Sequence, residues 1–258
     1  MRQIAYTDGT YRTDPQRVSL LARMFPSLTF YRRFLGIVWR ASIKAKRGRY
    51  DGAAWCESSL NILGALERVG VRIEIEGIEH VERLHTPCVV IANHMSVLET
   101  VLLPAILRPV RPVTFIVKES LLTYPVFSHI MRSRDPIALT RTNPRQDLRA
   151  VLEGGCDRLG CGISIVVFPQ TTRAVAFDPK QFSTIGVKLA ARAKVPIVPL
   201  VLRTDAWSNG KRLKDFGPID PSKPVHFSFG EPIQVEGRGA EEHQKIIERI
   251  NAKLQQWH

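Results

Sequence analysis

The sequence predicts an α/β fold with a largely parallel, mixed sheet flanked by helices. Short apolar runs that are typical of buried strands alternate along the chain with longer segments whose apolar residues recur at helical spacing. Strands connected through helices run parallel, and a chain of 258 residues is long enough to bury a sizeable core. With 44% hydrophobic and 24% charged residues, the composition is that of an ordinary globular protein.

Residues 1–50 are expected to form an N-terminal arm and amphipathic helices that dock on a membrane. Residues 1–14 are polar and predict a loose arm, and Asp14-Pro15 is a favourable helix start. From Ser27 the apolar residues of a second helix are interleaved with arginine and lysine: Phe30, Phe34, Ile37, Val38 and Trp39. Aromatic side chains beside cations are typical of a helix in a membrane interface, but an amphipathic helix packed on the domain would show a similar pattern.

Residues 51–258 are expected to form the main domain. It begins with a helix over 51–69, which Gly70 ends, and residues 71–76 alternate V-R-I-E-I-E like a half-exposed strand. Continuous apolar runs predict strands over 88–92 and 113–117, and a short strand is expected over 137–139. Helices over 101–107 and 124–131 connect these strands.

The second half of this domain continues the alternation. A helix begins at Asn143-Pro144, runs to about residue 159 and is broken by the Gly160-Cys161-Gly162 stretch before a central strand over 163–168. A helix over 181–193 and a strand over 197–202 follow. The polar residues 204–224 are expected to be a surface loop, 225–229 an edge strand and 240–256 a closing amphipathic helix.

His94 lies just past the end of the 88–92 strand, where open α/β sheets usually place their chemistry. Two interpretations of its surroundings stay open. In one, Asn93 or Ser96 caps the next helix and Glu99 completes a capping box. In the other, the Glu99 carboxylate orients the imidazole so that its second nitrogen can take a proton from a hydroxyl or amine. A carboxylate has two oxygens, so both interpretations can hold together.

Five blocks in order along the chain resemble the glycerolipid acyltransferase family, of the 1-acylglycerol-3-phosphate acyltransferase type. Residues 93–99, N-H-M-S-V-L-E, are similar to its N-H-x-x-x-x-D signature with glutamate for aspartate. Residues 118–121 resemble K-x-x-L, residues 135–141 take the place of G-x-x-F-I-x-R, residues 168–173, F-P-Q-T-T-R, resemble F-P-E-G-T-R, and residues 195–200 resemble the last block. Several weak signals in one order are more specific than any of them alone.

The resemblance implies transfer of a fatty acyl group from acyl-CoA or acyl carrier protein to a hydroxyl of a lysophospholipid-type acceptor, with 1-acylglycerol 3-phosphate as the expected acceptor. His94 would be the general base and Glu99 its orienting partner, with backbone amides near the helix start stabilising the oxyanion. The expected substrate-binding residues lie at the ends of neighbouring strands: Lys118, Arg141, Gln170, Thr171, Thr172 and Arg173. Arg141 and Arg173 would bind a phosphate, since guanidinium groups match phosphate oxygens.

Gln170 and Thr171 stand where the family has glutamate and glycine, which puts the acceptor in question. The alternatives are an acyltransferase with a different acceptor, or a catalytically weak or inactive relative that binds anionic membranes or lipids. No metal or further cofactor is expected beside the acyl donor, because a lone histidine with one carboxylate is a poor metal site.

A net charge of +13 favours anionic partners, among them a phospholipid surface or a phosphorylated substrate. No helix-turn-helix, RNA-recognition or zinc pattern accompanies this charge, so we expect no nucleic-acid partner.

No secretory signal or membrane-spanning run is recognisable, which predicts a cytoplasmic protein, peripheral on the cytoplasmic membrane face. The four cysteines contain no C-x-x-C pair and are expected to be reduced thiols.

Overall fold

The computed structural model describes residues 3–15, 17–211 and 213–257. It contains an eight-stranded sheet in the order β1-β2-β8-β7-β3-β6-β4-β5. The strands are β1 (Thr10–Arg12), β2 (Ile73–Glu76), β3 (Val89–Ala92), β4 (Val113–Lys118), β5 (Ile137–Leu139), β6 (Ser164–Val167), β7 (Ile197–Arg203) and β8 (Val225–Phe229). The β1–β2 and β7–β8 pairs are antiparallel and the other pairs parallel, which confirms the predicted α/β fold with a largely parallel, mixed sheet.

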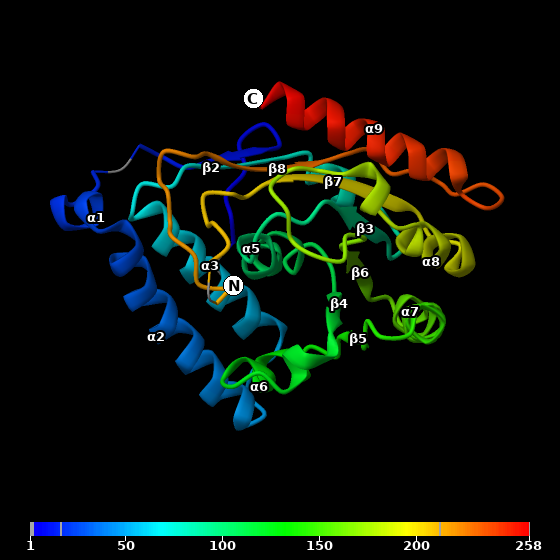
Figure 1. Ribbon diagram of the computed structural model, residues 1–258, viewed down its shortest axis with the longest axis horizontal. Helices are drawn as coiled ribbons and strands as arrows, with labels where there is room; N and C mark the ends of the chain where they lie inside the picture. Colours follow the sequence, from blue (N-terminus) through cyan, green and yellow to red (C-terminus); the bar gives the residue numbers. More distant parts are fainter. Residues whose placement is uncertain (1–2, 16, 212, 258) are drawn as a thin grey trace.

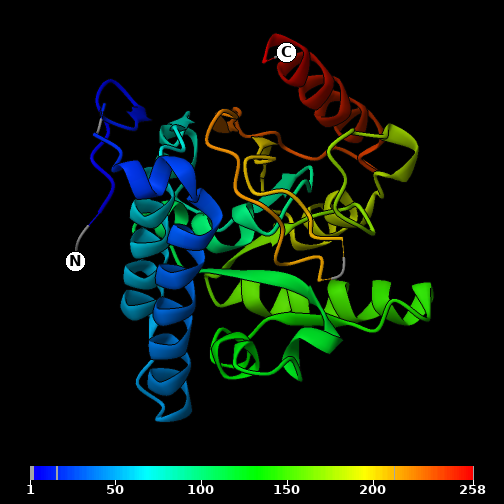
Figure 2. The ribbon, with the colours of Figure 1, turned by 60° about the vertical axis from the view of Figure 1, so that its left-hand side comes forward.

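Helices cover both faces of the sheet (Figures 1 and 2). They are α1 (Leu20–Met24), α2 (Pro26–Lys46), α3 (Gly52–Glu67), α4 (Glu79–Glu82), α5 (Leu98–Leu107), α6 (Phe127–Arg132), α7 (Pro144–Gly160), α8 (Ile185–Ala193) and α9 (Ala240–Gln256), with 3-10 turns η1 (Glu119–Leu122) and η2 (Pro179–Gln181). Alternate residues of β3 enter different cores: Val90 packs with α2, α3 and α5, and Ile91 with α7, α8 and α9. This explains why β3 is apolar at every position.

The N-terminal residues differ from the prediction. The segment expected to be a loose arm contains β1, which pairs with β2, and Thr13 N donates to Ile73 O at 3.0 Å. The first helix begins at Leu20 and not at Pro15, because the Ser19 hydroxyl accepts a hydrogen bond from Ala22 N and so caps the helix there.

Two further predictions differ from the structure: residues 225–229 do not form an edge strand, and residues 204–224 are not only a surface loop. Strand β8 lies between β2 and β7 in the sheet, and four of its five residues are buried. In the loop over 204–224, Trp207 is fully buried and its ring packs edge-on against Phe30 and Phe34 of α2 at 4.8 and 5.0 Å. The loop is therefore part of the core that joins α2 to the sheet.

Helix α2 has two different faces. Phe30, Phe34 and Val38, spaced by four residues, are buried in the core, whereas Trp39 is 62% exposed. The five apolar residues that were expected on one side of this helix therefore do not all lie on one side. The inner face of α2 is packed on the domain, which is the second of the two interpretations.

No helix in the described ranges is both long and apolar enough to cross a bilayer. All four cysteines are free thiols, with Cys56 and Cys88 buried.

Candidate active site

Residues from the ends of four neighbouring strands open onto one cavity of about 790 Å³. His94 follows β3, Lys118 ends β4, Arg141 follows β5, and the segment from Gln170 to Arg173 follows β6. The loops converge because β3, β6, β4 and β5 are parallel neighbours, so their carboxyl ends meet at one edge of the sheet. Of the eight predicted site residues, seven line this cavity and Glu99 lies directly behind His94.

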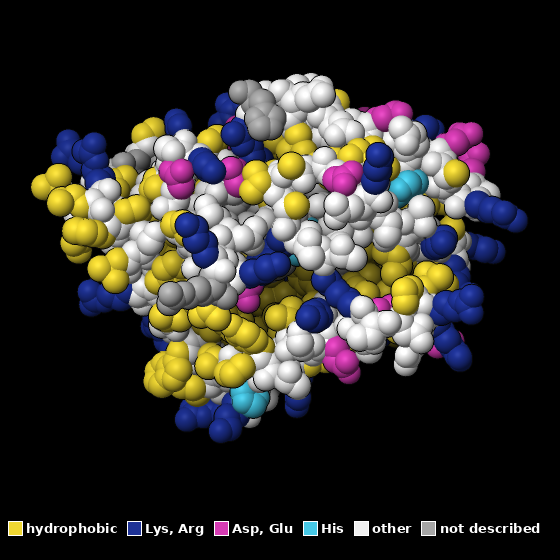
Figure 3. Space-filling view, viewed as in Figure 1, with side chains coloured by type: hydrophobic (Ala, Val, Ile, Leu, Met, Phe, Trp, Pro, Cys, Tyr) yellow, Lys and Arg dark blue, Asp and Glu magenta, His cyan; other side chains and the backbone are white. Residues whose placement is uncertain are grey.

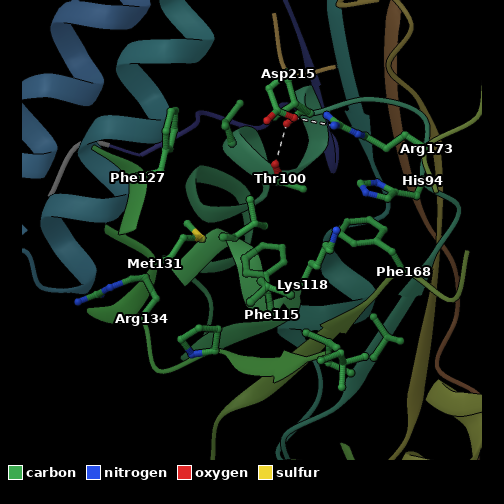
Figure 4. Close-up of a pocket in the computed structure, with 18 of the residues that line it drawn as sticks. His94, Thr100, Phe115, Lys118, Phe127, Met131, Arg134, Phe168, Arg173 and Asp215 are labelled. Carbon is green, nitrogen blue, oxygen red and sulfur yellow. Dashed lines mark hydrogen bonds and ion pairs between the residues drawn. The ribbon is translucent and has the colours of Figure 1, made fainter. Parts of the chain in front are cut away.

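The cavity is mostly apolar inside. Its walls come from α2, α3, α6 and β4, with Phe34, Trp55, Phe115, Phe127 and Met131 among them. Figure 3 shows a hollow in this face of the molecule, apolar within and with lysine and arginine at its edge, and Figure 4 shows His94, Phe168, Lys118 and Arg173 across it from Phe127 and Met131. The volume lies within the range of about 300–1,000 Å³ that is usual for ligand sites.

His94 and Glu99 form a hydrogen-bonded pair at the mouth of this cavity. His94 Nδ1 lies 2.9 Å from Glu99 Oε1, and the imidazole stacks on the Phe168 ring with 4.3 Å between ring centroids. An ionised carboxylate can only accept, so Nδ1 carries a proton, and in the neutral imidazole the lone pair lies on Nε2. The His94 side chain is 15% exposed, which leaves it open to a bound molecule.

The Glu99 carboxylate is fully buried and held by several donors. Met95 N and Ser96 N donate to Oε1 at 2.7 and 2.9 Å, and Thr204 Oγ donates to Oε2 at 2.5 Å. Burial raises the pKa of Glu99, but the hydrogen bond and charge of His94, together with the hydrogen bonds from the Thr204 hydroxyl and the Ser96 amide, outweigh it and hold the pKa below its ordinary value. Glu99 therefore contacts both His94 and the backbone at the helix start, as the two open interpretations allowed.

The loop that carries His94 is fixed from two further sides. Gln170 Oε1 accepts a hydrogen bond from His94 N at 2.7 Å, and the Asn93 side chain exchanges two 2.8 Å hydrogen bonds with the backbone of Leu202. Asn93 therefore joins β3 to β7 and does not cap α5. The amides of residues 94–96 all donate to side chains in this structure. The expectation that amides near the helix start stabilise an oxyanion stays a prediction.

The three predicted cations are at the rim in different surroundings. Lys118 is exposed, and Arg141 Nη1 donates to the carbonyl of Thr171. Arg141 has a φ of 61°, in the left-handed region, and its amide donates to Asp147 Oδ2 at 2.8 Å. Arg173 Nη2 forms a 2.5 Å ion pair with Asp215 Oδ1.

Sequence reasoning missed Thr204 and Asp215. Thr204 is a polar residue immediately after the buried strand β7, the same signal that identified His94, and could have been found in this way. Asp215 lies in a polar loop with no periodicity, and no pattern marks it. Among the described residues no group of three or more histidine, cysteine or acidic side chains could hold a metal ion.

The fold and the site together define an α/β enzyme whose candidate centre is a histidine–carboxylate pair at the mouth of an apolar cavity. The chain belongs to the Acyltransferase family, whose model matches residues 72–203, about half of the chain. It is accordingly an acyltransferase, and the resemblance to glycerolipid acyltransferases is confirmed.

Individual relatives agree with this assignment. The chain is 26% identical over 211 residues to the 1-acyl-sn-glycerol-3-phosphate acyltransferase of Pseudomonas aeruginosa, covering 82% of this chain and 76% of that protein. It is 35% identical over 136 residues to a probable 1-acyl-sn-glycerol-3-phosphate acyltransferase from Mycoplasma genitalium. This match covers 51% of this chain and 50% of that protein. The crystal structure of the 1-acyl-sn-glycerophosphate acyltransferase PlsC from Thermotoga maritima has the same fold, with a TM-score of 0.64, 22% identity and coverage of 92% of this chain and 96% of that one.

Proposed function

We propose that the protein transfers a fatty acyl group from acyl-CoA or acyl carrier protein to the hydroxyl of a lysophospholipid-type acceptor, with 1-acylglycerol 3-phosphate as the expected acceptor. The observation that carries the proposal is the position of His94 between an apolar cavity and a basic rim. An acyl chain fits the first and an anionic headgroup the second. The names of the relatives support the same acceptor.

The histidine–carboxylate pair supplies the proton transfer that such a reaction needs. The acceptor oxygen attacks the thioester carbonyl carbon while His94 Nε2 takes the hydroxyl proton, so that a carbon–oxygen bond forms. The carbon–sulfur bond then breaks, and the proton passes from Nε2 to the leaving sulfur. Glu99 stabilises the imidazolium between these two events through the contact with Nδ1. Neither a metal nor a covalent enzyme intermediate is required.

The test is the transfer reaction itself, followed by product mass with acyl-CoA or acyl carrier protein against a panel of lysolipids. Replacing His94 by alanine should lower turnover by a factor of about a hundred or more. His85→Ala, which changes an exposed histidine outside the cavity, is the matched control. Near-normal turnover in the His94 variant would reject the mechanism. Failure of the wild-type protein to consume any thioester while it binds lipid would favour the inactive, lipid-binding alternative.

The proposal extends to a peripheral position on the cytoplasmic face of an anionic membrane. Helices α1 and α2 present an outer apolar face whose residues are each at least 51% exposed: Leu20, Leu21, Met24, Phe25, Leu28, Leu35 and Trp39. Exposed arginines lie among them, and Figure 3 shows apolar and basic side chains together at this end of the molecule. This combination suits anionic lipid. The inner face of α2 lines the cavity, so an acyl chain would enter beside the bilayer.

Point substitutions test this docking better than deletion of the segment, because deletion would also remove Phe30, Phe34 and Val38 from the core. The double variant Leu20→Ser/Leu28→Ser should reduce co-sedimentation with vesicles that contain phosphatidylglycerol. Wild-type protein should bind vesicles of phosphatidylcholine alone more weakly. Val175→Ser, which changes an exposed apolar residue outside α1 and α2, should sediment like wild type. Unchanged sedimentation of the double variant would contradict the proposed docking face.

A further inference from the structure

Asp215 neutralises one of the cations that the proposed function assigns to the acceptor headgroup. Its Oδ1 lies 2.5 Å from Arg173 Nη2, and the two side chains are 31% and 16% exposed. Figure 4 shows the Asp215 carboxylate facing the Arg173 guanidinium at the same side of the cavity as His94. A phosphate that binds Arg173 through Nη2 would have to take the place of this carboxylate.

Most of the charged side chains that line the cavity are basic. The cationic side chains that line it are Lys118, Arg134, Arg141, Arg173, Lys188 and Lys214, and the acidic ones are Asp147 and Asp215. Asp147 accepts hydrogen bonds from the amides of Thr140 and Arg141 and is held in that role. Arg141 donates to a neutral carbonyl, so its charge is not compensated there. Asp215 is therefore the lining carboxylate that is paired with a rim cation.

The backbone around Asp215 is held by contacts on both sides, whereas its side chain is partly exposed. Tyr31 Oη of α2 donates to Gly217 O at 2.5 Å, and the Tyr31 and Phe216 rings lie 5.7 Å apart. Gly210 N donates to Lys214 O at 3.2 Å on the other side of Asp215. Because the Asp215 side chain is partly exposed, we expect rotation of this side chain, and not movement of the loop, to release Arg173.

We propose that Asp215 is an internal competitor for Arg173, which weakens the hold of the site on the phosphate shared by acceptor and product. The inference rests on the proposed function. A phosphate monoester carries more charge and more acceptor oxygens than one carboxylate, so it can displace Asp215 from Arg173. Breaking the ion pair lowers the net affinity for the phosphate. Because acyl transfer leaves the headgroup unchanged, tight binding of the phosphate would hold the product as firmly as the acceptor and would not speed the chemical step. Return of Asp215 to Arg173 favours release of the product.

The experiment measures equilibrium binding by calorimetry with two soluble probes, 1-hexanoylglycerol 3-phosphate and uncharged 1-hexanoylglycerol. Asp215→Asn should tighten binding of the phosphate probe about fivefold, the effect of one partly exposed ion pair, and leave the uncharged probe unchanged. Glu153→Gln is the matched control, because it removes the same charge from the Arg149–Glu153 ion pair outside the cavity. In an Arg173→Ala background the Asp215 substitution should have no effect on either probe.

Binding that becomes weaker or stays the same in Asp215→Asn would overturn the inference, as would an equal gain for both probes. Asp215→Ser provides a second variant should the first fail to fold, and circular dichroism checks both. Binding does not require turnover, so this result is independent of the His94 test. A wild-type protein that binds the phosphate probe but transfers no acyl group would count against the proposed function alone.

Discussion

Thr204 Oγ donates a 2.5 Å hydrogen bond to Oε2 of Glu99, the oxygen opposite the one that His94 contacts. The two residues are separated by 105 positions and both are fully buried. The contact joins the end of β7 to the first turn of α5, and it holds the carboxylate from behind while Oε1 faces the imidazole. Glutamate is one methylene longer than the aspartate of the family signature, and this hydrogen bond fixes the longer side chain.

Replacing Thr204 by valine should therefore impair His94 through Glu99. Valine keeps the shape but removes the donor, so the unfolding free energy should fall by about 1–3 kcal/mol and turnover by about tenfold. Thr204→Ser retains the hydroxyl and should recover most of the turnover. Urea unfolding and acyl transfer measured on both variants provide the check, and equal turnover in the two would show that the hydroxyl has no part in positioning Glu99.

The lowered pKa of Glu99 predicts how stability depends on pH. The folded protein releases the Glu99 proton at a lower pH than the unfolded chain, whose pKa is near the ordinary 4.5. Between the two values the unfolded chain binds more protons, so the unfolding free energy increases with pH. The contribution is complete above the unfolded pKa and is lost as pH falls through the folded pKa. Urea unfolding between about pH 3 and 6 should show that the unfolding free energy rises less steeply with pH in Glu99→Gln than in wild type.

Gln170 is expected to act through the backbone of His94 and not only as a substrate contact. It is 5% exposed, and its oxygen accepts the hydrogen bond from His94 N. Gln170→Leu would leave this amide without its partner, costing about 1–3 kcal/mol of unfolding free energy and lowering turnover. The exposed Gln146, replaced by leucine, is the matched control for thermal unfolding and acyl transfer. An unchanged melting temperature in Gln170→Leu would contradict the anchoring role.

The convergence of the site could be predicted because buried parallel strands have a clear pattern. The ends of β3, β4, β5 and β6 are recognisable in the sequence as the ends of apolar runs, and His94 and Arg141 each lie two positions after one of them. The contacts of Asp215 and Thr204 could not be predicted in the same way. They join residues 42 and 105 positions apart, and tertiary packing alone decides which of many polar loop residues comes close.

The orientation of α2 is a second case in which the sequence left the answer open. Apolar residues occur at helical spacing on two of its faces, and the packing of α3, α6 and Trp207 against the helix decides which face is covered. The alternation in β8 was also ambiguous. It predicts that one face of the strand is more polar than the other, but it does not identify the neighbouring strands. In both cases a local pattern was recognised while the partner came from a distant part of the chain.

Substitution of two adjacent residues of α2 should change the unfolding free energy by very different amounts. Phe34 is buried and its ring lies 5.0 Å from that of Trp207, whereas Leu35 is 51% exposed. Phe34→Ala should cost about 3–5 kcal/mol of unfolding free energy, because it leaves a cavity in the core. Leu35→Ala should change it by no more than about 0.5 kcal/mol. Urea unfolding of the two variants makes the comparison, and a similar loss in both would mean that the faces of α2 are assigned incorrectly.

Asp147 should set the acceptor affinity through the backbone of Arg141. Its Oδ2 accepts from Arg141 N and its Oδ1 from Thr140 N at 3.0 Å, which holds Arg141 in a left-handed conformation that is unfavourable for a residue with a side chain. Asp147→Asn leaves one acceptor oxygen for two amides, so Arg141 should relax away from the rim and the KM for a phosphate-bearing acceptor should rise about fivefold, with a smaller change in kcat. Asp157→Asn, exposed on the same helix, is the control. The measurement is steady-state kinetics with 1-acylglycerol 3-phosphate. An unchanged KM in Asp147→Asn would show that acceptor binding does not depend on the hydrogen bonds from Asp147 to the backbone of Arg141.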